Sequence, residues 1–110
     1  MNFLAHIYLS GQEEEVIVGN FVADSIKGNL INRFPAGMEK GIRIHREIDH
    51  YTDQHPVFRE SKARLAPTYN HYSGVIVDLY YDHFLAKNWK DYSDEDLSKV
   101  VSRTYFLLVR

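Results

Sequence analysis

The fold is decided by residues 36–54, AGMEKGIRIHREIDHYTDQ, near the middle of the chain. Successive residues of an α-helix are about 100° apart, so side chains three and four positions apart share a face. One face of this segment carries Met38, Ile42, His45, Asp49 and Thr52. The pattern predicts a long amphipathic helix whose inward face holds a histidine and an aspartate one turn apart.

The His45–Asp49 pair is unusual on a face that packs against a core. A carboxylate is costly to bury without a partner. A histidine and a carboxylate at positions i and i+4 can bind the same divalent cation. The alternative explanations are a buried His–Asp hydrogen bond and an ion pair with an arginine from another helix.

Helical patterns also account for the rest of the chain, and no strand is expected. Glutamates at residues 13–15 suit the start of a helix, and Ser93-Asp94-Glu95-Asp96 is typical of a capping box. The prolines, at 35, 56 and 67, fall between helical patterns. We expect an all-α bundle of about six helices, at residues 2–9, 13–27, 36–54, 57–65, 70–89 and from 93 onward, with a loop at 29–34.

The composition indicates one ordinary folded domain, residues 1–110, with 45% apolar and 25% charged residues. A formal net charge of −2 argues against a nucleic-acid-binding protein, because phosphates require clustered cations. The absence of cysteine favours a reducing compartment, so we expect a cytoplasmic protein. The N-terminus does not have the pattern of a signal peptide, and no apolar run is long enough to span a bilayer.

Acidic residues recur on other predicted helices. The helix at 70–89 is apolar nearly all round, which predicts a central position, yet it holds Asp78 and Asp82 at i and i+4. Carboxylates in a central helix require cations as partners. The alternatives are an arginine partner from another helix, or a position of Asp78 at the exposed rim of the helix. Asp24 lies near the end of the second predicted helix. Lys27, at i+3, is an alternative to a metal ion as the partner of its carboxylate. Carboxylates mixed with imidazoles suit Mn²⁺, Fe²⁺ or Mg²⁺, and such an ion activates water and neutralises a phosphoryl oxygen.

Four stretches of the sequence together resemble the acyl carrier protein phosphodiesterases, also called ACP hydrolases. The matching stretches are MNFLAH with Leu9-Ser10, GNFVAD at 19–24 with Lys27-Gly28, GIRIHREID at 41–49 with Thr52-Asp53 and His55-Pro56, and DLYYDHFLA at 78–86 with Trp89. The resemblance implies an all-helical fold related to the HD-domain phosphohydrolases. It also implies removal of the 4′-phosphopantetheine arm from holo-acyl carrier protein (ACP), with Mn²⁺ or Mg²⁺ as cofactor.

The resemblance implies a set of site residues as well. The metal is expected among Asp24, His45, Asp49, Asp82 and His83. The residues expected to assist catalysis near it are His6, Lys27 and Asp53. A basic surface that steers the acidic carrier protein is expected at Arg43, Arg46, Arg59, Lys62 and Arg64.

The chain stops at Arg110 inside a predicted helix, whereas members of the resembled family continue with further helices. Residues 1–110 are therefore expected to be the N-terminal portion of the family fold. The inward face of the last helix is expected to be Leu97, Val100, Val101, Tyr105 and Leu108. The outward residues Phe106, Leu107 and Val109 predict a homo-oligomer through this helix. The rival interpretations are a general HD-type phosphohydrolase acting on a small nucleotide or phosphoester, and a non-catalytic helical domain that binds a partner through its apolar end.

Overall fold

The computed structural model describes residues 2–109, apart from the side chains of residues 29 and 30. Over this range it contains helices and no strand, which confirms the all-α prediction. The α-helices are α1 (Phe3–Leu9), α2 (Glu14–Val22), α3 (Ala36–Gln54), α4 (Pro56–Tyr69), α5 (Ser73–Lys87) and α6 (Leu97–Val109). Short 3-10 helices join them: η1 (Ala23–Ser25), η2 (Gly28–Arg33), η3 (Asn70–Tyr72) and η4 (Trp89–Asp91).

Helices α2 and α3 cross in close contact, because glycine lies at the points of nearest approach. A Cβ atom on Gly19 would lie 2.1 Å from the carbonyl oxygen of Met38, and one on Gly41 would lie 2.2 Å from that of Val16. Ile42, on the inward face of α3, is 0% exposed and packs with Ala23 and Ile31. The inward face predicted for α3 is therefore the face that forms the core.

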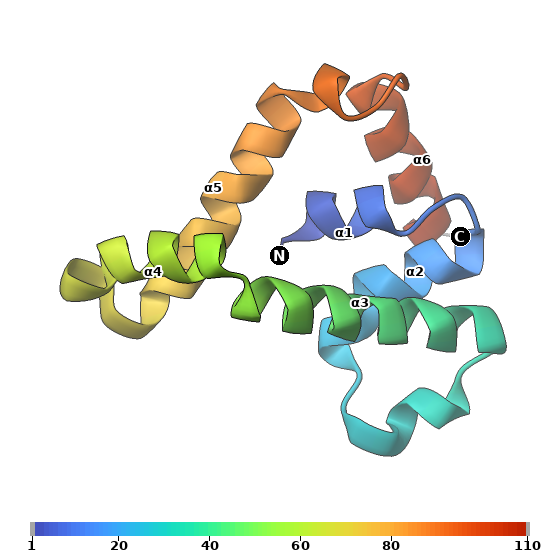
Figure 1. Cartoon of the computed structure of the whole chain (residues 1–110). Helices are drawn as coiled ribbons and strands as arrows, with labels where there is room; N and C mark the ends of the chain where they lie inside the picture. Colours follow the sequence, from blue (N-terminus) through green and yellow to red (C-terminus); the bar gives the residue numbers. More distant parts are fainter. Residues whose placement is uncertain (1, 110) are drawn as a thin grey trace.

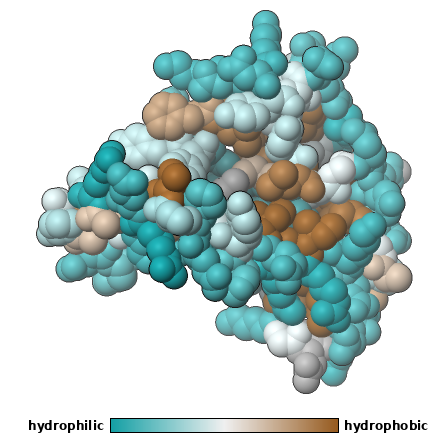
Figure 2. Space-filling view, in the orientation of Figure 1, coloured by the Kyte–Doolittle hydropathy of each residue, from teal (hydrophilic) through white to brown (hydrophobic). Residues whose placement is uncertain are grey.

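The remaining helices frame this pair (Figure 1). Helix α1 lies beside α2, within the frame formed by α3, α5 and α6, α4 continues the line of α3 outward, and α5 returns from the far end of α4 toward η4 and α6. The result is flat, with principal extents of 42 × 36 × 21 Å. Figure 2 shows apolar residues gathered in the middle of this face, over α1, α2 and α3, with hydrophilic residues around them.

Several predicted boundaries are wrong. Helix α2 ends at Val22 and gives way to η1, instead of continuing to residue 27. Most of the predicted loop at 29–34 is the 3-10 helix η2. Helix α4 continues past Leu65 to Tyr69, so Pro67 lies inside it and not between helices. Proline lacks the N–H that would bond the carbonyl four residues earlier, and the helix ends two residues later, before Asn70, whose φ is +51°.

The prediction that α5 is central is also wrong. Only Ser73 and Val77 of this helix are buried, and four large apolar side chains are between 49% and 58% exposed. They are Val75, Leu79, Tyr80 and Phe84. Helix α5 packs on α4 and on α1 along one side. Its all-round apolar composition therefore does not correspond to all-round burial.

The last helix begins later than predicted, and its inward face is different. It starts at Leu97, and the Ser93 hydroxyl accepts a hydrogen bond from the Glu95 N–H in a preceding turn, so the predicted capping box is not formed. Its buried residues are Val100 and Thr104. Val101 and Tyr105, expected inside, are more than half exposed, whereas Leu97 and Leu108 are half-buried. Phe106 and Val109 face outward as predicted, and Leu107 is half-buried.

Among residues 2–109, no helix combines the length and apolar character that crossing a membrane requires.

Candidate metal centre

Side chains from α1, α3 and η1 converge where α1 lies beside the α2–α3 pair. His6 of α1 is 2% exposed and His45 of α3 is 5% exposed. Asp49, one turn after His45, is half-buried between them and the surface. Asp24 of η1 approaches His45 from the solvent side, with a side chain that is 75% exposed. The centre is thus buried on its histidine side and open on its Asp24 side.

The nitrogen and oxygen atoms of this cluster face one another at short range. The Nε2 atom of His6 lies 3.0 Å from Asp49 Oδ1, and the Nε2 atom of His45 lies 3.1 Å from Asp49 Oδ2. The same His45 Nε2 lies 3.1 Å from Asp24 Oδ1. One ligand atom from each of His6, His45 and Asp49 falls within 4.8 Å of the other two.

A chain of buried hydrogen bonds fixes which nitrogen of His45 carries a proton. The Ser10 hydroxyl has one proton, which it donates to the His6 carbonyl at 2.6 Å, so it accepts from the Asn20 amide nitrogen at 2.7 Å. The Asn20 carbonyl oxygen therefore faces His45 Nδ1 at 3.0 Å. Because that oxygen can only accept, Nδ1 carries the proton, and a neutral ring presents the lone pair of Nε2 to the centre.

This arrangement requires a positive charge at the centre. With the Nε2 lone pair exposed, His45 faces the Asp24 and Asp49 carboxylates acceptor to acceptor, which is repulsive. Either a second proton on the ring or a metal cation removes the repulsion. Metal-bound histidines commonly donate their other ring N–H to a neighbouring acceptor, as His45 does to Asn20. The donor set therefore fits a divalent cation.

The two histidine rings lie face to face, with centroids 3.8 Å apart and planes inclined by 12°. Both rings direct their Nε2 atoms toward the Asp49 carboxylate, where a single cation can contact them together. The Nδ1 atom of His6 is buried and has no hydrogen-bond partner among the described residues.

Electrostatics favour the ionised form of Asp49. Burial raises the pKa of this carboxyl, but its hydrogen bond with His6 and its electrostatic interactions with the groups around it outweigh burial, and the net pKa lies below the ordinary value. Asp78 of α5 shows the opposite balance, because burial raises its pKa and the nearby Asp49 and Asp53 raise it further. Asp49 is therefore available as an anionic ligand at neutral pH.

Other residues predicted for the site have different surroundings. Both carboxylate oxygens of Asp82 accept backbone hydrogen bonds, from Leu4 at 3.0 Å and from Ala5 at 3.1 Å. His83 is exposed and packs edge-on against Phe84. Lys27 and Asp53 are exposed. The structure thus groups His6, His45, Asp49 and Asp24, and metal ligation by Asp82 and His83 stays a prediction.

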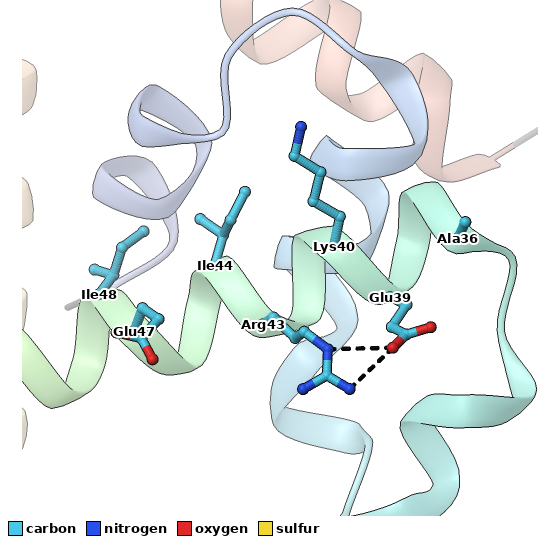
Figure 3. A pocket seen from close by; sticks show the side chains of 7 residues that line it. All are labelled: Ala36, Glu39, Lys40, Arg43, Ile44, Glu47 and Ile48. Atoms are coloured by element: carbon cyan, nitrogen blue, oxygen red, sulfur yellow. Dashed lines mark hydrogen bonds and ion pairs between the residues drawn. The ribbon is translucent and has the colours of Figure 1, made fainter.

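The basic residues predicted for substrate binding are divided between α3 and α4. Arg43 pairs with Glu39 on the outer side of α3, as Figure 3 shows, and the Arg46 guanidinium donates to the Ile26 carbonyl at 3.3 Å. On α4, Arg64 pairs with Glu60, whereas Arg59 and Lys62 are exposed. The pocket in Figure 3 lies on the outer face of α3 and includes neither His45 nor Asp49.

Sequence reasoning missed Asn20 and Ser10, which are buried and set the orientation of His45. It also assigned His6 to a position near the metal, whereas His6 is one of the three clustered groups. One signal was available: Asn20 interrupts the apolar run Val16–Val22, where an amide requires buried partners.

The fold and the site together define an all-helical protein with a clustered histidine–aspartate centre whose three ligand atoms lie close enough to share one metal ion. Residues 1–110 match the family described as "Acyl carrier protein phosphodiesterase". The chain belongs to this family. Its relation to HD-domain proteins stays a prediction, and no solved structure matches the chain.

Curated relatives carry the same description. Acyl carrier protein phosphodiesterase of Photorhabdus laumondii is 36% identical over 89 residues, which is 81% of this chain and 45% of the relative. The protein of that name from Yersinia pestis is 36% identical over 81% of this chain and 46% of its own length. The one from an Enterobacter species is 36% identical over 86% of this chain and 49% of its own length. The chain thus spans about half the length of the curated relatives it matches.

Proposed function

We propose that the chain carries the metal centre of a phosphodiester hydrolase that removes 4′-phosphopantetheine from holo-ACP. One observation carries this proposal: His45 Nε2, whose tautomer is set by Asn20, faces two carboxylate oxygens at 3.1 Å. The family's name supports the substrate class. The proposed cofactor is Mn²⁺, with Mg²⁺ and Fe²⁺ as alternatives, because mixed imidazole and carboxylate donors suit these ions.

In this proposal His6, His45 and Asp49 hold the cation, and Asp24 completes the site from the solvent side. A bound divalent cation lowers the pKa of water and neutralises charge on a phosphoryl oxygen. Asn20 keeps the His45 ring in one orientation and one tautomer. Burial of both histidines keeps bulk water from that side, so a substrate phosphate approaches over the exposed Asp24. Lys27 and Asp53 are exposed residues proposed to assist there.

The basic residues of α3 and α4 are proposed to steer the acidic carrier protein. Arg59 and Lys62 are the strongest candidates, because Arg43 and Arg64 are already paired with glutamates. A cytoplasmic location belongs to the same proposal, and the absence of cysteine, which favours a reducing compartment, supports it. Homo-oligomerisation through α6 is also proposed, supported by Phe106 and Val109, which are 67% and 60% exposed.

The substrate proposal is tested by mass spectrometry of holo-ACP incubated with the 110-residue protein and Mn²⁺. We expect the carrier protein to lose the mass of phosphopantetheine. The double reversal Arg59→Glu/Lys62→Glu should lower the rate on holo-ACP about tenfold at low salt, because electrostatic steering weakens, and should spare bis-p-nitrophenyl phosphate.

Arg33→Glu is the matched control, since Arg33 is an exposed arginine of η2, a segment that lies away from α4 (Figure 1). Equal loss on both substrates in the double variant would favour a general phosphohydrolase. Failure of the wild type to release phosphopantetheine would remove the assignment to holo-ACP.

A further inference from the structure

The N-terminal end of α1 is capped by a residue that lies 77 and 78 positions away in the sequence. Asp82 of α5 accepts hydrogen bonds from the N–H groups of Leu4 and Ala5, one on each carboxylate oxygen. Such N–H groups, in the first turn of a helix, have no partner within the helix. The side chain of Asn2, at the N-cap position, makes no capping hydrogen bond. A distant carboxylate therefore does what a local cap ordinarily does.

The opposite end of α1 is held by the segment that follows α5. The Tyr8 hydroxyl donates to the Tyr92 carbonyl at 2.9 Å, and the Tyr8 ring packs edge-on against Trp89 with centroids 5.5 Å apart. Helix α1 has only seven residues, and helices this short are not stable alone. These two attachments hold the ends of α1, and His6 lies between them, where its carbonyl also accepts a hydrogen bond from the Asn20 amide of α2 at 3.1 Å.

We propose that Asp82 is a positioning residue for the metal centre: by capping α1 it holds His6 Nε2 against Asp49. The inference rests on the proposed function, because it concerns the same centre. Both oxygens of Asp82 are engaged by backbone N–H groups, and its negative charge lies at the positive end of α1. Loss of this carboxylate releases the first turn of α1, and with it the ring of His6.

The test compares Asp82→Asn with wild type in the 110-residue protein, using Mn²⁺ alone as the probe. We expect Mn²⁺ affinity, measured by electron paramagnetic resonance, to fall about tenfold, the usual effect of losing a group that orients a ligand. Amide hydrogen exchange at Leu4 and Ala5 should become faster. Asp91→Asn is the matched control, because Asp91 is an exposed aspartate of η4, and it should change neither measurement.

A second variant separates capping from direct ligation. The backbone of Asn2 is extended (φ −100°, ψ −177°), as an N-cap requires, so Asn2→Asp can supply a carboxylate to the same N–H groups. Added to Asp82→Asn, it should restore slow exchange and most of the Mn²⁺ affinity. If Asp82→Asn alone does not fold, the double variant must fold, and its failure to do so overturns the proposal.

Loss of Mn²⁺ in Asp82→Asn with unchanged exchange at Leu4 and Ala5 would also overturn it, since Asp82 would then be a ligand and not a cap. If the wild type itself binds no Mn²⁺, the proposed metal centre fails. The exchange data then still decide the capping role: faster exchange that Asn2→Asp reverses supports it, and unchanged exchange contradicts it.

Discussion

Two regions of the molecule differ in how closely their helices approach. In the α1–α3 unit (residues 3–54), glycines bring α2 and α3 into backbone contact, and His6, His45 and Asn20 are buried. In the α4–α5 arm (residues 56–87), the only buried side chains are Phe58, Ser73 and Val77, although α5 carries apolar residues nearly all round. Close backbone approach, and not apolar composition, is what positions the candidate site. The arm contributes to it through one carboxylate, Asp82.

The largest expected effect is on the free energy of unfolding, and it comes from replacing one glycine in each region. Gly41→Ala in α3 should destabilise the fold by about 3 kcal/mol, because its Cβ would meet backbone atoms of α2 that cannot shift independently. In the arm, a Cβ on Gly74 would meet only the Lys62 side chain, at 3.8 Å. Gly74→Ala should therefore stabilise by up to about 1 kcal/mol, as alanine does in a helix. Urea denaturation of both variants measures the two changes in unfolding free energy. Equal changes would contradict the difference in helix approach between the two regions.

The next effect concerns the hydrogen-bond chain behind His45. Asn20→Ala removes the acceptor for Nδ1, so the ring loses its fixed tautomer and orientation. We expect Mn²⁺ affinity to fall roughly 10- to 100-fold. Asn88→Ala, directly after the α4–α5 arm, is the control, because among the described residues the exposed side-chain amide of Asn88 bonds only to the Phe84 carbonyl. Titration calorimetry that shows the same affinity in both variants would mean that Asn20 plays no part in metal binding.

The smallest expected effect is a pH dependence from Asp78, at the boundary between the two regions. Burial raises its pKa in the folded state, so the protonated form favours folding. Its contribution is present below the ordinary aspartate pKa and is lost as the pH rises through the higher folded value. Asp78→Asn removes this loss, so the stability of the variant relative to wild type should increase as the pH rises from the ordinary aspartate pKa toward neutral pH. A constant difference across that range in urea titrations would contradict the assigned direction.

Periodicity predicted α3 well, and it predicted the burial of α5 and the inward face of α6 poorly. The inward face of α3 follows from its own sequence, since Ile42 and His45 share one stripe and are both buried. Burial of α5 and the inward face of α6 depend on which neighbours are present, and a helical pattern alone does not contain that information. The four matching stretches therefore indicate the family, whereas they do not indicate how α5 and α6 pack.

The candidate site was predictable in part for the same reason. His45 and Asp49 lie on one helix, so their spacing is visible in the sequence. The contacts of Asn20 with Ser10 and of Asp82 with Leu4 join different helices, and only the tertiary arrangement creates them. For Asp82 the sequence indicated a carboxylate in need of a partner, but not that backbone N–H groups would be the partner.

The central claim is that the α1–α3 unit holds one divalent cation, and binding of Co²⁺ or Mn²⁺ to the metal-free protein tests it most directly. Wild type should bind one ion per chain. His45→Gln and Asp49→Asn should lose at least about 100-fold in affinity with unchanged helical circular dichroism, because each removes a ligand. His71→Gln, at an exposed histidine of η3, should bind as wild type does. Absence of binding to wild type, or equal affinity in His45→Gln and His71→Gln, would contradict the claim.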